Sequence, residues 1–212
     1  MRQAIGPAGL RRTLIAAALI AAALPAQRAA ALDEGPGEAK AIAACDERLC
    51  RMLLQRSPTG EDLKCRLSKT WARTTIKEAD QQQLSWGFGD ARCSVDINIA
   101  RAAVIAAISS GGKPAKLWVP AHTANCVVEH NGRLEPVTAT LAPKIVFKDG
   151  KAEKVWVNLV RVDGPESIKA TLTAAAQLSD NVGLFHHALV KAINRYIYRH
   201  CPKTYPQLQA TK

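Results

Sequence analysis

The stretch that decides the fold is KLWVPAHTANCVVEHNGRLEPVTATLAPKIVFKDGKAEKVWVNLVRV, residues 116–162. It contains the dipeptides Asn131-Gly132 and Asp149-Gly150, each between two apolar runs. Dipeptides of this kind are the strongest short-range signals for a β-hairpin, because both residues tolerate the positive φ of a type I′ turn. The stretch therefore predicts a three-stranded antiparallel meander with strands over residues 116–130, 135–148 and 151–162.

Two prolines interrupt this meander, Pro120 in its first strand and Pro143 in its second. Proline has no N–H to donate to a neighbouring strand, so within sheets it is confined to edges and bulges. We expect an edge or a bulge at each of these positions.

A further strand and a short helix are predicted over residues 93–110. Apolar and polar side chains alternate over residues 93–99, the pattern of a strand that is buried on one face. Residues 100–110 are rich in alanine, a poor strand former, and Gly111-Gly112 follows them, which favours a helix. The apolar positions of the strand are Cys93, Val95, Ile97 and Ile99.

The segment before this strand admits two interpretations. A turn at residues 57–60 and alternation over residues 63–67 predict a β-hairpin whose first strand is residues 50–56. A competing helix would pass through residues 42–52, where apolar side chains recur at helical spacing. We expect the hairpin. The apolar positions of the competing helix are Ile42, Cys45, Leu49 and Met52.

Three other segments predict helices. Residues 75–84 open with Thr75 and Glu78 in capping-box spacing. A second helix follows residues 163–165, and a last helix runs from a cap at residues 179–181 to His200. The last helix has a regular apolar face of Val182, Phe185, Leu189, Ile193, Tyr196 and Ile197.

Together these elements predict an α+β fold. Its sheet is mostly antiparallel, with the C-terminal β-meander packed against the long C-terminal helix. Disulfides stabilise it.

All six cysteines fall beyond residue 44, an even number in a chain addressed to an oxidising compartment, so we expect three disulfides. Six cysteines allow 15 pairings, of which sequence selects none. Our hypothesis pairs Cys45 with Cys50, Cys65 with Cys93, and Cys126 with Cys201. It requires that Cys45 and Cys50 do not share one regular helix, because their Cα atoms would then lie more than about 7 Å apart.

Residues 1–31 predict a cleavable signal peptide. Arg2, Arg11 and Arg12 precede an apolar run over residues 13–24, and cleavage is expected after Ala31, with Ala26 as the alternative. The run is shorter than the roughly 20 apolar residues that cross a bilayer, so no membrane anchor is expected after processing. The pattern favours the general secretory route over the twin-arginine route. The protein is then periplasmic or secreted, with a mobile mature N-terminus over residues 32–44 and a single α+β domain over residues 45–212.

Positive charge dominates the mature chain. Four of the 29 Lys and Arg residues lie in the signal and none of the 18 acids does, which leaves 25 against 18 and a formal charge of +7. Such an excess favours acidic partners. Four basic residues recur every four positions along the last helix and form a candidate binding stripe: His187, Lys191, Arg195 and Arg199. The alternative is a solvated helix face whose late cations complement the helix dipole.

A second candidate binding segment is the loop over residues 86–92. Trp86 and Phe88 could form an aromatic wall for a ligand, or could pack into the core, which we favour. The histidines do not stand in a metal-ligand frame, the cysteine spacing does not match a zinc or haem site, and no nucleophile motif is present. We therefore expect no cofactor, no metal and no enzyme, although His122, His130 and Asp90 could converge in space.

These observations predict an exported binding or envelope-accessory protein without enzymatic activity. Its partner is an anionic or amphiphilic envelope component, a lipid or a glycan. The alternative is a module of inhibitor or chaperone-like type that binds another exported protein. A nucleic-acid partner is disfavoured, because the chain is exported and lacks aromatic residues clustered within a basic stretch.

Overall fold

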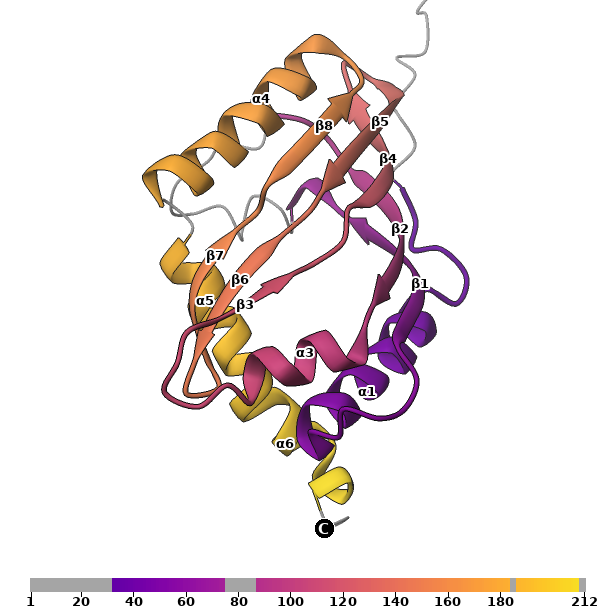
Figure 1. Cartoon of the computed structure of the whole chain (residues 1–212). Coiled ribbons are helices and arrows are strands. Elements are labelled where there is room, and N and C mark those ends of the chain that lie inside the picture. Colours follow the sequence, from indigo (N-terminus) through magenta and orange to yellow (C-terminus); the bar gives the residue numbers. More distant parts are fainter. Residues whose placement is uncertain (1–31, 75–86, 184–185, 210–212) are drawn as a thin grey trace, which may run out of the picture.

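The computed structural model describes residues 32–74, 87–183 and 186–209 and shows an α+β fold with two antiparallel sheets (Figure 1). The large sheet has the order β1-β2-β4-β5-β8 and the small sheet the order β3-β6-β7. The strands of the large sheet are β1 Leu63–Trp71, β2 Ala91–Ile99, β4 His122–His130, β5 Arg133–Leu141 and β8 Leu159–Asp163. The strands of the small sheet are β3 Ala115–Trp118, β6 Lys144–Lys148 and β7 Lys151–Trp156.

The predicted meander is present, but each of its three long strands is divided in two. In each predicted strand, one part lies in one sheet and the rest in the other sheet. The first predicted strand is divided into β3 and β4, the second into β5 and β6, and the third into β7 and β8. Both predicted turns are found, with Asn131 and Asp149 at positive φ. Pro120 and Pro143, where we expected an edge or a bulge, lie in the breaks between the strand segments. They are excluded from the strands because a proline donates no ladder hydrogen bond.

The three division points lie side by side across the meander. The N–H of Val119 donates to the carbonyl oxygen of Pro143 at 2.9 Å, and the N–H of Ala142 donates to that of Asn158 at 3.0 Å. Asn158 has a φ of 49°, in the left-handed region that asparagine tolerates. The meander therefore passes from one sheet to the other along a single line of interrupted pairing.

The prediction of a hairpin over residues 50–67 is wrong. Residues before the turn form helix α1, Glu38–Gln55, and β1 pairs instead with β2, from Leu63 opposite Ile99 to Trp71 opposite Ala91. The turn thus joins a helix to a strand, and the competing helical pattern was the correct one. Local alternation could not reveal this, because the true partner of β1 lies beyond residue 90.

Helix α1 also covers part of the N-terminal segment for which mobility was predicted. It begins at Glu38, whose side chain is buried, and the carboxylate accepts a hydrogen bond from the hydroxyl of Thr70 at 2.9 Å. The contact ties the start of α1 to the end of β1.

The predicted strand and helix over residues 93–110 are both found, as β2 and as α3, Arg101–Ile108. The predicted helix after residue 165 is α4, Glu166–Gln177, which ends in a π-helical turn, Leu178–Val182. The cap predicted at residues 179–181 is wrong, because these residues belong to that turn. The predicted helix over residues 75–84 and the signal peptide lie outside the described residues.

The C-terminal segment, which we define as residues 186–204, is helical throughout. It consists of α5, His186–Arg195, a π-helical turn, Tyr196–His200, and α6, Cys201–Thr204, and it is followed by the 3-10 turn Pro206–Gln209. Its predicted apolar face is corrected at Val182, which precedes the segment and is 72% exposed. Leu189 is half-buried, and Ile193, Tyr196 and Ile197 belong to the core, whereas Phe185 lies outside the described residues.

All six cysteines are in disulfides, but each predicted pair is wrong. The bonds join Cys45 to Cys65, Cys50 to Cys201, and Cys93 to Cys126. Cys45 and Cys50 share helix α1, which excludes a bond between them. Cys93 and Cys126 lie directly opposite each other in β2 and β4, with 4.0 Å between their Cα atoms.

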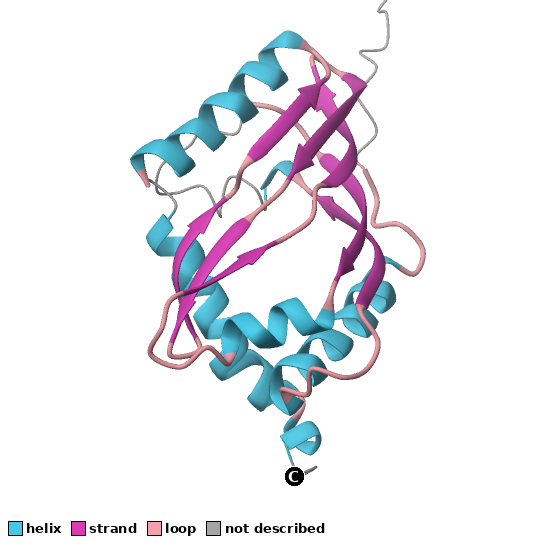
Figure 2. Ribbon diagram, viewed as in Figure 1, coloured by secondary structure: helices cyan, strands magenta, loops and turns pink. Residues whose placement is uncertain are grey.

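Figure 2 shows one helix beside the strands at the top of the view and the other helices gathered at the opposite end and side of the molecule. Two apolar clusters hold the helices and sheets together. The larger joins α1, α3, the small sheet and the C-terminal segment, with Met52, Ile108 and Phe147 among its buried members. The smaller lies between α4 and the large sheet around the fully buried Ile168. One face of the small sheet and one side of the C-terminal segment are therefore committed to the core, and their opposite sides face outward.

Candidate anion-binding groove

The inward side of the C-terminal segment covers the open edge of β7. The side-chain amide of Asn194 accepts a hydrogen bond from the N–H of Ala152 at 2.8 Å and donates one to its carbonyl oxygen at 2.9 Å. Nε2 of His186 lies 3.0 Å from the carbonyl oxygen of Glu153, and the hydroxyl of Tyr198 donates to that of Gly150 at 2.8 Å. Side chains thus satisfy backbone groups that an edge strand would otherwise expose.

Asp180, in the π-helical turn after α4, binds backbone groups just beyond the end of β7. Its carboxylate accepts hydrogen bonds from the N–H groups of Val157 and Asn158, both at 2.7 Å. These contacts fix the point where β7 gives way to β8.

A second anchor fixes the C-terminal segment to α1. The carboxylate of Asp46 accepts hydrogen bonds from the hydroxyls of Tyr196 at 2.7 Å and Tyr205 at 2.9 Å, and lies 2.9 Å from Nε2 of His200. The Cys50–Cys201 disulfide links the same two elements. Together the edge contacts and this anchor hold the C-terminal segment in one position.

The anchor shifts the acid–base behaviour of its members. Burial alone would raise the pKa of Asp46, but hydrogen bonds from His200, Tyr196 and Tyr205 outweigh it and hold that pKa below its usual value. Burial and the neighbouring carboxylate raise the pKa of the Tyr196 hydroxyl. Asp46 is therefore the ionised acceptor of the cluster.

Between β7 and the outward side of α5 lies a groove of about 450 Å³, which we call the α5 groove. All four residues of the predicted basic stripe line it, and Lys151 of β7 adds a fifth basic side chain. The full lining is Lys151, His187, Val190, Lys191, Asn194, Arg195, Tyr198 and Arg199. Asn194 and Tyr198, whose polar atoms bind the edge of β7, thus border the groove where the two sides of the segment meet. The four residues share one face of the segment, as their spacing predicts. Lys151 belongs to the same groove but comes from β7, so helical spacing could not reveal it.

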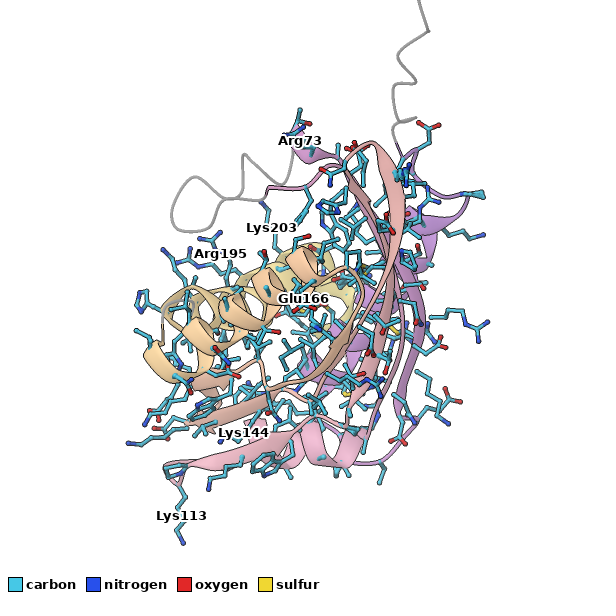
Figure 3. All side chains as sticks on the ribbon, turned by 90° about the horizontal axis from the view of Figure 1, so that it is seen from above. Arg73, Lys113, Lys144, Glu166, Arg195 and Lys203 are labelled. Carbon is cyan, nitrogen blue, oxygen red and sulfur yellow. A yellow bond between two sulfur atoms is a disulfide. The ribbon has the colours of Figure 1, made fainter. Side chains whose placement is uncertain are left out.

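The basic side chains of the α5 groove have no partner within the part of the chain that the structure describes. All five are exposed, and none forms a hydrogen bond or an ion pair. A neighbouring hollow, which shares Arg195 and Arg199 with the groove, adds Lys203. In Figure 3 the labelled Arg195 projects away from the body of the protein. Positive charge is thus concentrated there without internal compensation.

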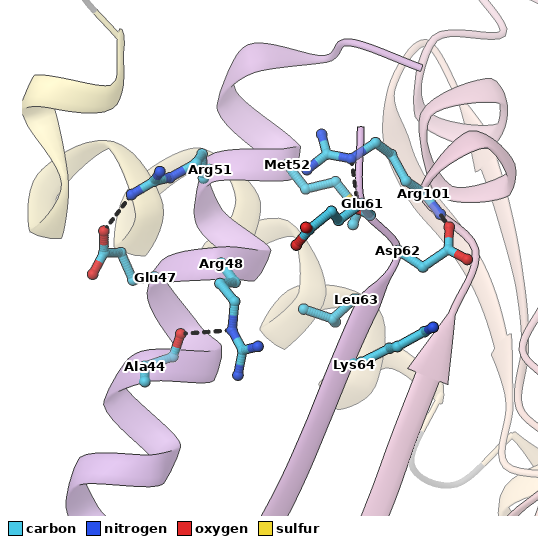
Figure 4. Close-up of a pocket in the computed structure, with 10 residues that line it drawn as sticks. All are labelled: Ala44, Glu47, Arg48, Arg51, Met52, Glu61, Asp62, Leu63, Lys64 and Arg101. Carbon is cyan, nitrogen blue, oxygen red and sulfur yellow. Dashed lines mark hydrogen bonds and ion pairs between the residues drawn. The ribbon is translucent and has the colours of Figure 1, made fainter. Parts of the chain in front are cut away.

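A larger hollow of about 770 Å³ lies between α1 and β1, and we call it the α1 hollow (Figure 4). Several of its charged side chains have partners within the protein, two of them in one ion pair and the others with backbone groups. Arg51 pairs with Glu47 at 2.6 Å, and the Nε of Arg101 donates to the carbonyl oxygen of Glu61 at 2.9 Å. The N–H of Arg101 also donates to the carboxylate of Asp62 at 3.0 Å. These contacts fasten the turn between α1 and β1 to the start of α3.

The second predicted binding segment does not form a ligand wall from Phe88. This side chain is buried in the smaller apolar cluster, and its ring centroid lies 5.5 Å from that of His130 in an edge-to-face arrangement. The favoured alternative, core packing, is therefore correct for Phe88. Trp86 lies outside the described residues.

The possible convergence of His122, His130 and Asp90 is excluded by their positions. The two histidines stand at opposite ends of the nine-residue strand β4, about 26 Å apart. Asp90 instead accepts hydrogen bonds from the N–H groups of Leu32 and Arg73.

One group among the described residues has the spacing of metal ligands: Asp46, Cys50 and His200. The sulfur of Cys50 is bonded to Cys201, and the carboxylate of Asp46 already accepts the hydrogen bonds of the anchor. The residues present therefore serve the anchor rather than a metal.

Within residues 32–74, 87–183 and 186–209, no helix is both long and apolar enough to cross a membrane. No protein-family model, curated protein or solved structure matches the chain.

Proposed function

We propose that the protein is an exported binding or envelope-accessory protein without enzymatic activity, whose partner is an anionic component of the cell envelope, a lipid or a glycan. The observation that carries the proposal is the α5 groove, where five basic side chains line one surface and none has a partner among the residues that the structure describes. Cations held close together repel one another, and an anionic partner removes that repulsion.

The groove also suits an amphiphilic partner. Val190 and Tyr198 line it alongside the long stems of its lysine and arginine residues. Such stems offer apolar surface while their charged ends remain in water. An acidic group attached to an acyl chain or a sugar ring would find both kinds of contact.

Export is supported by the three disulfides, because such bonds persist in oxidising compartments and are rare in the reducing cytoplasm. The residues predicted as a signal peptide supply the route. The alternative, a protein-binding module, would need a continuous exposed apolar patch. Among the described residues the four most exposed large apolar side chains, Val182, Trp118, Val160 and Leu134, lie on the turn after α4, β3, β8 and β5. The basic side chains instead gather in one groove, which favours the anionic partner.

The test measures the affinity of the purified mature protein for dextran sulfate, a soluble polyanion, by isothermal titration calorimetry. The groove variant is Lys191→Gln with Arg195→Gln and Arg199→Gln. Its matched control, the hollow variant, is Arg48→Gln with Arg51→Gln and Lys64→Gln, which removes the same charge from the α1 hollow.

We expect the groove variant to bind at least about tenfold more weakly than the wild type, and the hollow variant to bind within about twofold of it. Equal losses in the two variants would show that net charge alone attracts the polyanion. Unchanged binding by the groove variant would show that the basic stripe is only a solvated helix face.

A further inference from the structure

The outward face of the small sheet is unusually basic. Strand pairing sets Trp118 opposite Lys144 and Lys144 opposite Trp156, so these three side chains share one face. Pairing also sets Val146 between Lys116 and Lys154, and Lys148 opposite Lys151. The outward face therefore carries Lys116, Trp118, Lys144, Val146, Lys148, Lys151, Lys154 and Trp156.

The opposite face of the same sheet is committed to the core. Leu117, Phe147 and Ala152 are all buried in the larger apolar cluster. Side chains alternate between the two faces of a strand, so the lysines and tryptophans are directed away from the protein. The outward face is a surface and not part of a second core.

Lys144 is held between the two tryptophans. Its Nζ lies 3.9 Å from the ring centroid of Trp156 and 5.1 Å from that of Trp118. A cation over an indole is attracted by the ring quadrupole, which favours this arrangement of the three side chains. Trp118 nevertheless remains 60% exposed. A large apolar ring is thus held in place at the surface among positive charges.

This face is continuous with the α5 groove, because Lys151 belongs to both. Lys113, in the loop before β3, also points away from the body of the protein (Figure 3). Two acidic residues adjoin the five lysines of the face: Glu153 at the bulge of β7, and Asp149 in the turn before it. Positive charge therefore clearly exceeds negative charge over the face.

We infer that the outward face of the small sheet docks on the surface of an anionic lipid bilayer, with Trp118 inserted at the level of the headgroups. The inference rests on the proposed function and assigns its partner. An extended sheet of anionic headgroups complements cations that are spread over a whole face, each contributing attraction near such a surface. Tryptophan is enriched at membrane–water interfaces, where its ring meets both apolar and polar surroundings.

A glycan fits this face less well. Sugar hydroxyl groups both donate and accept hydrogen bonds, and lysine ammonium groups only donate. The residues that share the outward face with Trp118 and Trp156 are lysines and a valine, so a sugar would find carboxylate acceptors at the margin of the face, at Glu153 and Asp149, rather than on the face itself. The chemistry of the face therefore favours phosphate headgroups.

The test is co-sedimentation of the mature protein with vesicles of equal parts phosphatidylglycerol and phosphatidylcholine, compared with pure phosphatidylcholine. Two variants alter the outward face: Trp118→Ala, and Lys116→Gln with Lys148→Gln and Lys154→Gln. The control for the first is Trp71→Ala, which removes an exposed tryptophan from the large sheet, and the control for the second is the hollow variant. All variants are also titrated with dextran sulfate.

The wild type should sediment with the anionic vesicles only, and each face variant should bind them about tenfold more weakly, while both controls bind like the wild type. Trp118→Ala should bind dextran sulfate normally. Bromine-labelled phosphatidylglycerol should quench tryptophan emission in the wild type, and much less in a Trp118→Phe variant.

Wild-type binding to the anionic vesicles that survives in both face variants would overturn the inference and leave the proposed function intact. Binding to dextran sulfate without binding to vesicles would also overturn it, in favour of a soluble acidic glycan. Failure to bind either probe would refute the proposed function itself.

Discussion

The two sides of the C-terminal segment differ in how their polar groups are used. On the inward side, Asn194 pairs with the edge of β7, and Tyr196 and His200 meet Asp46. On the outward side, Lys191 and its basic neighbours have no partner among the described residues. A partnered group stabilises the fold, whereas an unpartnered charge is available to a ligand. Substitutions on the two sides should therefore have separable effects, on stability and on binding.

The largest effect on stability is expected from removing the disulfide that ties the segment to α1, by Cys50→Ser with Cys201→Ser. The bond spans 151 residues, and closing so long a loop restricts the unfolded chain by about 5 kcal/mol. Urea denaturation measures the loss. Removing Cys93–Cys126, which spans 33 residues, should cost about 4 kcal/mol. A larger loss from the shorter loop would contradict this ranking.

The next largest effect is expected from Asp46→Ala, which leaves two tyrosines and a histidine without their shared acceptor. The free energy of unfolding should fall by about 2–3 kcal/mol. The neighbouring Glu47→Ala is the control, since the Glu47 side chain is 43% exposed and forms a surface ion pair with Arg51, and it should cost less than about 0.5 kcal/mol. Similar losses in the two variants would show that the anchor contributes little.

Stability should also depend on pH through the same carboxylate. The pKa of Asp46 in the folded state lies below its ordinary value of 3.8, so the folded state favours the ionised form. Its contribution is complete above about pH 5 and is lost as pH falls through the folded-state pKa. Denaturation of the wild type and of Asp46→Ala between pH 2 and pH 7 checks this. The two curves should converge in acid, and parallel curves would refute the assignment.

A smaller effect is expected from Asn194→Leu, which removes both hydrogen bonds to Ala152. Leaving this edge unsatisfied should cost about 1–2 kcal/mol. Hydrogen exchange measures it locally, because the Ala152 amide should lose protection while amides in β4 keep theirs. Unchanged protection at Ala152 would show that the edge is covered without the Asn194 amide.

The smallest effect on stability is expected from the groove variant. Its three side chains are exposed and have no partner in the described part of the chain, so the free energy of unfolding should change by less than about 0.5 kcal/mol. Thermal unfolding checks this beside the binding measurement. A large loss of stability would show that these side chains stabilise the fold, as the inward side chains do.

Local signals in the sequence predicted local structure well. The Asn131-Gly132 and Asp149-Gly150 turns, the strand over residues 93–99 and the basic stripe of the C-terminal segment depend on neighbours within a few residues, and each is found. The α+β class follows from them. The prolines indicated two of the three points where the meander divides. Nothing in the sequence around Asn158 predicted the third point, between β7 and β8.

Long-range partners could not be predicted. The disulfides depend on which strands and helices pack together, so Cys93 meets Cys126 through the register of β2 and β4. Lys151 reaches the α5 groove from another element. The row of Trp118, Lys144 and Trp156 likewise forms only when three strand segments align. The sequence determines these alignments, but no local pattern of residues reveals them.

The most direct test of the binding surface is NMR mapping of backbone amides in the mature protein during titration with dextran sulfate. The largest shift changes should fall on Lys151 and on the lining residues of the α5 groove between His187 and Arg199. Small changes are expected in the α1 hollow around Arg51, which is paired with Glu47, and around Arg101, which donates to the carbonyl oxygen of Glu61. Changes centred on the α1 hollow, or spread evenly over all basic residues, would contradict the account.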